Sequence, residues 1–284
     1  MFNAPIKLPL LLGSATILLS SIIASCSSGS TSSEAESLYA QASDAFNAGH
    51  YEQSLSLIDS IDTAYPRAID IRKQCRLLKP QVIERLAALR ISAIDSLLAL
   101  NAYRGDSLRS TISLEKNPVE GYYVGVDSRG VDVLTTPGIH SRVSPDYHFY
   151  FVASCPKPIG LTSVSVEIPD GQSASTPAVT FDGERSTRHS SCQTITFTET
   201  ESAPIAQFVE QHRDQPITIR FRGDSGNHTM PLSDTQRRSL TSCYGLVAAA
   251  NNDKALRLES EKWQRQLQVA RTQLATVADT TSRH

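Results

Sequence analysis

The spacing of hydrophobic positions changes twice along the chain. Steps of three and four residues, which place apolar side chains on one face of a helix, run through residues 34–116 and again through residues 232–284. Between them, residues 117–231 contain short alternating apolar and polar runs separated by turn residues, a pattern typical of strands. The pattern therefore predicts an α+β protein in which helices flank a β-rich module.

The first helical region divides into a hairpin and a longer helix. Two apolar stripes within residues 34–65, separated at Gly49, predict two short antiparallel helices that end before Pro66. A longer helical pattern then continues to Lys116, and Pro80 inside it is expected to kink or restart the helix. Residues 34–116 are thus predicted to be helical throughout.

The β-rich middle is expected to hold short antiparallel strands and one short helix at residues 202–212. The segment Asp127-Ser128-Arg129-Gly130 is predicted to form a tight turn between the first two strands. Such strands, spaced by turns, favour a small antiparallel sandwich or barrel. The predicted strands cover residues 122–126, 131–134, 148–153, 161–168, 178–181, 194–198 and 217–221.

A heptad seam marks the C-terminal helix, for which Ser233 is the predicted N-cap. Apolar or small residues recur there at steps of four and three, which is typical of a coiled coil. The seam is expected to lie antiparallel against the earlier helix, residues 86–100, giving two coiled-coil-like arms. The alternative is a homodimer through the C-terminal helix. The seam residues are Leu256, Ser260, Trp263, Leu267, Ala270, Leu274 and Val277.

The N-terminal segment has the features of an export signal. Lys7 precedes an apolar run without a charge, residues 8–24, which is short for a membrane span. The run ends in Ile23-Ala24-Ser25-Cys26, which resembles the lipobox of bacterial lipoproteins. This resemblance implies that residues 1–25 are a signal peptide removed by cleavage, and that Cys26 carries the lipid.

The residues after Cys26 predict a tether and a location. Residues 26–33 are rich in serine and are expected to form a flexible tether. Surface-displayed lipoproteins of Bacteroidota often carry an acidic cluster here, whereas the first acids in this chain are Glu34 and Glu36. Ser27 stands where many lipoproteins kept in the inner membrane have Asp. Together these features favour the outer membrane, facing the periplasm.

The charge balance and the motifs limit the candidate functions. Lys plus Arg number 27 and Asp plus Glu 29, a net charge of −2, which argues against a nucleic-acid partner. Aromatic residues make up 6%, which is low for a sugar-stacking surface. We find no catalytic motif and predict no cofactor and no metal site, since His189 and Cys192 alone lack further ligands.

Four cysteines remain after lipidation of Cys26. The exported compartment permits disulfides, and four cysteines allow three pairings that the sequence does not distinguish. Cys155 and Cys192 both lie in the β-rich middle and are the expected pair. The alternative is that the cysteines are small buried apolar side chains.

The hairpin resembles a single tetratricopeptide repeat. The similarity rests on Gly49 to Ser54, followed by Ile58, Ile61 and Pro66. One repeat cannot bury its own apolar face, so it either packs on the next helix or forms part of a peptide-binding groove. With the lipobox, residues 72–82 and residues 240–246, the layout resembles the tetratricopeptide-like lipoproteins of Bacteroidota.

These features predict a lipid-anchored envelope protein that is not an enzyme. Its helical stalk would present the β-rich module to a protein partner, and its lipid would hold it to the membrane. One alternative is a periplasmic adaptor of a transport or efflux assembly, although such adaptors run β–hairpin–β rather than helix–β–helix. Another is an envelope hydrolase of an unrecognised type.

Overall fold

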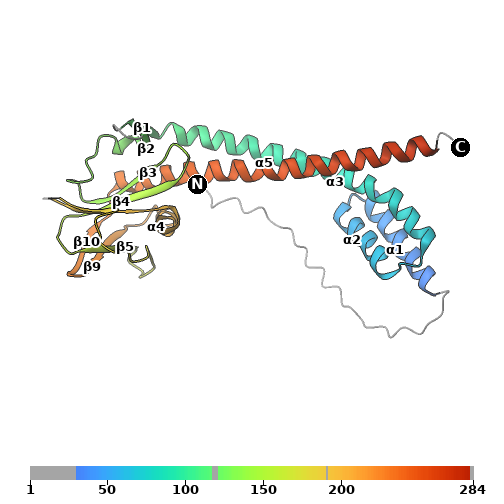
Figure 1. The fold of residues 1–284 in the computed structure, drawn as a ribbon, viewed down its shortest axis with the longest axis horizontal. Helices are drawn as coiled ribbons and strands as arrows, with labels where there is room; N and C mark the ends of the chain where they lie inside the picture. The colour runs from blue at the N-terminus through green and yellow to red at the C-terminus, as the bar shows by residue number, and fades with distance from the viewer. Residues whose placement is uncertain (1–29, 117–120, 190, 282–284) are drawn as a thin grey trace. The chain divides into compact units, whose positions relative to one another are not determined.

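The computed structural model describes residues 30–116, 121–189 and 191–281 (Figure 1). The fold is α+β, with five helices and two antiparallel sheets among the described residues. The chain divides into two compact units, one of residues 100–253 and one of residues 30–99 with 254–281. The boundary falls inside two long helices, and not at the helix ends that the sequence pattern predicted.

The helical unit begins with the predicted hairpin. Helix α1 (Ser30–Asn47) and helix α2 (Tyr51–Ala64) are joined at Gly49, whose φ of +80° favours glycine. The buried Ser54 hydroxyl donates to the Ala42 carbonyl at 2.7 Å and ties the two helices together. Helix α1 begins inside the segment predicted as a tether, because serine and threonine are well tolerated at helix starts.

Helix α3 (Ile69–Arg109) covers the apolar face of this hairpin. Ile58 and Ile61 of α2 are fully buried against α3, and Pro80 lies inside α3 without ending it. The single repeat-like hairpin therefore packs on the next helix, which is one of the two alternatives that the sequence suggested. The α3 residues in this core are Ile71, Cys75, Leu78 and Val82.

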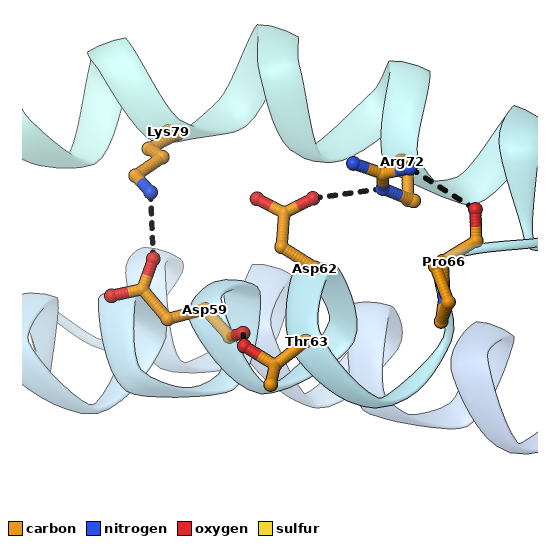
Figure 2. Close-up of polar contacts among 6 residues, drawn as sticks. All are labelled: Asp59, Asp62, Thr63, Pro66, Arg72 and Lys79. Carbon is orange, nitrogen blue, oxygen red and sulfur yellow. Dashed lines mark hydrogen bonds and ion pairs between the residues drawn. The ribbon is translucent and has the colours of Figure 1, made fainter.

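Ion pairs border the contact between α2 and α3 (Figure 2). Lys79 Nζ lies 2.6 Å from Asp59 Oδ1, and Arg72 Nε lies 3.1 Å from Asp62 Oδ1. Arg72 also donates to the Pro66 carbonyl at 3.0 Å, so one side chain fixes both the end of α2 and the following turn. These pairs are partly exposed, so each contributes little stability by itself.

Helix α5 (Asp234–Thr281) carries the predicted heptad seam. Leu256, Ser260 and Ala270 are buried, and the other four seam residues are half-buried, whereas most neighbouring positions are exposed. Arg271 Nε pairs with Glu84 Oε1 of α3 at 3.1 Å. The periodicity therefore identified the buried face of this helix correctly.

Both sheets lie in the unit of residues 100–253, which we call the β-containing unit. The six-stranded sheet has the order β1-β2-β3-β4-β8-β7, and the four-stranded sheet has the order β10-β9-β5-β6. All pairs are antiparallel, and neither sheet closes into a barrel. The strands are β1 (Ile112–Lys116), β2 (Gly121–Gly125), β3 (Gly138–Val143), β4 (Phe149–Cys155), β5 (Leu161–Glu167), β6 (Ser173–Ser175), β7 (Ser186–Arg188), β8 (Gln193–Phe197), β9 (Thr218–Gly223) and β10 (Gly226–Pro231).

One apolar core joins both sheets to helix α4 (Glu199–Gln211) and to the first half of α5. Phe151 of β4 and Phe221 of β9 are fully buried in it. Tyr244 of α5 packs edge-on against Phe149, with ring centroids 5.5 Å apart. Because strand side chains alternate, the other face of the six-stranded sheet points away from this core, and we call it the outer face.

The ends of α3 and α5 that belong to this unit lie side by side in antiparallel order. Asn101 donates to the Ala249 carbonyl at 2.9 Å, and Asn252 donates to the Asn101 side chain at 3.2 Å. Farther along, the Gly245 Cα faces the Leu108 side chain. The backbone N–H of Gln236 donates to Ser233 Oγ at 3.2 Å, which confirms the predicted N-cap of α5.

Several predicted strand positions need correction. Residues 112–116 are strand β1 and not the end of a helix, because Ile112 to Lys116 pair with β2. Residues 131–134 and 178–181 alternate in polarity but are not strands, whereas β3, β6, β7 and β10 were not predicted. Helix α4 starts at Glu199, earlier than expected, because Thr198 and Glu201 form a capping box.

Among the described helices, α3 alone is long and apolar enough to pass a length-and-composition test for a membrane span. The core helix of a soluble protein passes the same test, so this finding does not assign α3 to a membrane. Cys26, residues 1–25 and the first residues of the predicted tether lie outside the described residues.

Candidate functional site

The outer face of the six-stranded sheet is covered over part of its area by residues 126–137, which we call the strap. Ser154 of β4 donates to the Val133 carbonyl at 2.5 Å, and His140 Nε2 lies 2.8 Å from the Thr136 carbonyl oxygen. The predicted turn at Asp127 to Gly130 thus leads into this strap instead of into a second strand. Val152 and Thr194, the register partners of His140 and Ser154, are both buried.

Burial beneath the strap changes the titration of His140. Desolvation lowers the pKa of this imidazole, the nearby Arg142 charge lowers it further, and the contact with Thr136 opposes both. Neutral His140 can donate its Nε2 hydrogen to the Thr136 carbonyl, whereas water solvates the imidazolium better than this site does. The folded state therefore favours the neutral form.

Stability is expected to fall when the pH drops below about 6.5, the ordinary histidine pKa. The unfolded chain then binds a proton that folded His140 resists, so the loss continues down through the lowered folded-state pKa. Urea unfolding at pH 7.5 and pH 5 should show a larger loss for the native chain than for His140→Gln. Equal losses in the two proteins would contradict this assignment.

Beyond the strap, the outer face presents two tyrosines and an arginine. Arg142 of β3 places its guanidinium carbon 4.1 Å from the centre of the Tyr122 ring, and its register partner on β4 is Tyr150. The Tyr122 hydroxyl donates to Glu115 Oε2 at 3.1 Å. Burial raises the pKa of Tyr122 and the Arg142 charge opposes it, so the phenol stays protonated as a donor.

A hollow of about 370 Å³, open to solvent, adjoins Tyr150 between the ends of β4 and β8. His148 Nδ1 lies 2.9 Å from Glu199 Oε2 at its edge, and both side chains are exposed enough to be well solvated. Threonine hydroxyls from β8 and the start of α4 supply further polar groups. The lining residues are His148, Phe149, Tyr150, Thr196, Thr198, Glu199 and Thr200.

A strained turn precedes β4 and carries His148, which is one of the residues that line this hollow. Tyr147 has a φ of +63°, a left-handed conformation that is costly for a bulky side chain. The Ser144 backbone N–H donates to the His148 carbonyl and the Ser144 hydroxyl accepts from the His148 N–H, which closes the β3–β4 hairpin. The Tyr147 ring stacks on Tyr123 at a centroid distance of 6.5 Å. The turn thereby directs His148 toward Glu199.

A second hollow, of about 360 Å³, lies beside the first turns of α5 and is rich in arginine. Its charges are largely engaged within the protein. Arg238 Nη2 pairs with Asp127 Oδ2 at 2.8 Å, and Arg237 donates to the Arg213 carbonyl at 2.8 Å. This hollow therefore offers less unmatched charge than the outer face does.

The cysteines predicted to pair are both buried in this unit. Cys155 and Cys192 are free thiols in the structure. Burial raises the pKa of both thiols. The two cysteines lie in neighbouring chain segments, because Cys155 is the register partner of Gln193, the residue that follows Cys192. The disulfide that we expected is not formed here, and it remains a prediction for the oxidised protein.

Cys243 is buried where α5 packs on β2 and β3. Its pKa is raised to about 11 by burial, partly offset by hydrogen bonds with Ser141 and Ser239. The same Ser239 hydroxyl accepts from the Gly125 backbone N–H at 3.2 Å. This small polar network fixes α5 to the sheet and keeps the thiol protonated, so we assign it a structural role.

The remaining residues weighed from the sequence have structural explanations. Glu184 N–H donates to Asp182 Oδ1 at 3.0 Å within a turn, so this acidic pair has a structural role. Among the described residues, no group of three or more histidine, cysteine or acidic side chains could hold a metal ion. The outer-face residues were missed because strand register, which brings Arg142 beside Tyr150, has no local signal.

Comparison of the chain with known proteins finds no matching family model, no matching curated protein and no matching solved structure.

Proposed function

We propose that this chain is a lipid-anchored protein of the bacterial cell envelope that acts as a non-enzymatic interaction module. The lipid on Cys26 holds it in the outer membrane, facing the periplasm, and the outer face of the six-stranded sheet binds a partner. The observation that carries the proposal is the segment from Lys7 to Cys26, with its basic start, uncharged apolar run and lipobox-like end.

Features of the folded chain support this proposal. Helix α1 begins at Ser30, only a few residues after Cys26, so a lipid there would hold the protein near a membrane. The core of the β-containing unit is filled by large apolar side chains such as Phe149 and Phe197. Aromatic and charged side chains instead gather on the outer face, where a partner has access.

Replacing Cys26 with alanine tests the anchor. In a bacterial host that processes lipoproteins, we expect Cys26→Ala to move nearly all of the protein from the membrane fraction to the soluble fraction. Mass spectrometry of the native chain should show an N-terminal Cys26 that carries a diacylglyceryl group and an acyl chain. Ser27→Ala is the matched control, because it changes the next residue and leaves the lipobox intact.

Two outcomes would refute the anchor. One is full membrane retention of Cys26→Ala, and the other is a purified native chain that still begins at Met1. Fractionation of the inner and outer membranes would test the location separately, since Ser27 is the residue that favours the outer membrane.

The second candidate is an adaptor in a transport assembly. It is favoured by the antiparallel contact of α3 with α5 beside the sheets, at Asn101 and Ala249. Helical pairs joined to β modules also occur in efflux adaptors. Crosslinking in intact cells separates the candidates, because capture of a transporter would favour the adaptor and its absence among the captured proteins would favour the first proposal.

A further inference from the structure

We propose that the open part of the outer face binds an acidic saccharide, whose carboxylate is held by Arg142 and one of whose sugar rings lies against Tyr150. The inference rests on the proposed function, because it names the ligand of the face that we propose for interaction. Three observations carry it: the unmatched charge of Arg142, the aromatic side chain beside it, and the adjoining hollow, whose lining is largely apolar and includes three threonines.

The charge of Arg142 is the first observation. Its guanidinium stacks on the Tyr122 ring at 4.1 Å, and among the described residues no carboxylate forms an ion pair with it. Two described acids near Arg142 are already engaged: Glu115 accepts from Tyr122 and from the Gly130 N–H, and Glu199 faces His148.

Stacking also orients Arg142. A guanidinium held over a ring has less rotational freedom, so it needs less further ordering to bind a carboxylate through two parallel hydrogen bonds. A ligand carboxylate is therefore the group that complements Arg142.

The ring surface and the hollow are the second and third observations. Tyr150 is the register partner of Arg142 on β4 and also lines the hollow, so a ligand bound by Arg142 reaches the hollow across one strand. About 370 Å³ is near the lower end of small-molecule sites and suits one or two sugar rings.

The lining of the hollow is mostly apolar with a few polar groups, an arrangement that small-molecule sites share and that suits the C–H face of a sugar ring. Thr196 and Thr200 also line the hollow, and a threonine hydroxyl can donate and accept hydrogen bonds as sugar hydroxyls do, whereas the Thr198 hydroxyl already donates to Glu201. The 6% aromatic content of the whole chain does not oppose this, because the tyrosines gather locally on one face.

A matched pair of saccharides tests the proposal by titration calorimetry at low salt. The full chain, purified in detergent, is titrated with tri-galacturonic acid and with galactotriose, which is neutral. We expect the acidic probe to bind roughly tenfold or more tightly than the neutral probe, because charge-assisted hydrogen bonds are stronger than neutral ones. Arg142→Gln should remove this preference by weakening the binding of the acidic probe.

Arg188→Gln is the matched control. Arg188 also lies over an aromatic ring, with its guanidinium carbon 5.9 Å from the centre of Phe181, but it is on β7 and does not line the hollow. This variant should keep the native preference for the acid. Arg142→Lys, which keeps the charge but not the paired hydrogen bonds, should retain part of it.

The proposal fails if the native chain binds neither probe, or if Arg142→Gln keeps the acidic preference while its thermal unfolding is unchanged. A photocrosslinker placed at Tyr122 then identifies the occupant of the face. Capture of a protein there would refute the saccharide and leave the proposed interaction function standing. Release of the native chain from membranes would instead count against the proposed anchor and not against this site.

Discussion

Replacing Phe151 with alanine is expected to lower the free energy of unfolding of the β-containing unit by about 3–5 kcal/mol. Phe151 is fully buried in the middle of β4, and its ring centroid lies 5.3 Å from that of Phe197 on β8. Truncation leaves a cavity that rigid strands on both sides cannot close. The cost therefore includes lost burial and lost packing against Phe197.

Amide hydrogen exchange followed by mass spectrometry is the suitable measurement. The single tryptophan, Trp263, belongs to the helical unit, so its fluorescence would not report directly on the sheets. Peptides covering β4 and β8 should lose protection in Phe151→Ala. Leu114→Ala is the control, because Leu114 is 42% exposed on edge strand β1 and should cost under about 1 kcal/mol. Equal losses in the two variants would contradict the packing that we describe.

Replacing Gly223 with alanine is expected to cost about 2–3 kcal/mol, the upper part of the range for overpacking. A Cβ built on Gly223 would lie 2.4 Å from the Ile159 carbonyl oxygen and 2.5 Å from that of Gly160. Both atoms are backbone, so no side chain can rotate away. The Ser225 N–H donates to the Ile159 carbonyl at 2.9 Å, which holds the loop under the β9–β10 hairpin.

At Gly105, in the same unit, substitution by alanine is expected to have the opposite effect on stability. It lies inside α3 with nothing within 4 Å of a built Cβ, so Gly105→Ala should stabilise the chain by about 0.5–1 kcal/mol. Chemical denaturation of both variants measures the difference. If Gly223→Ala were as stable as the native chain, the close approach of residues 159–160 to β9 would be wrong.

Elements with a strong local period were predictable. The α5 seam from Leu256 to Val277 was correct because each turn of a helix repeats the same apolar position, whatever the partner is. Strands β4, β5, β8 and β9 were found for the same reason, since alternation marks a strand that is buried on one face. The hairpin of α1 and α2 followed from two stripes separated at Gly49.

Elements defined by their partners were not predictable in this way. Residues 112–116 continue the helical spacing from Leu108 to Ile112, and they are a strand only because β2 pairs with them. Residues 131–134 alternate as a strand would, yet they cross the outer face as part of the strap. The outer-face site also joins residues from β2, β3, β4 and β8. Strand β3, which carries Arg142, was not predicted, and the register that places Arg142 beside Tyr150 has no local signal.

By itself, the sequence determined the α+β class and the buried faces of the helices, because each depends on the pattern of consecutive residues. The export signal that ends at Cys26 stays a prediction from the sequence. Only the tertiary structure decided the strand order, the strap over His140 and the meeting of Arg142 with Tyr150. The physical reason is that periodicity is a local property of the chain, whereas register and pairing depend on hydrogen bonds and packing between residues far apart in sequence.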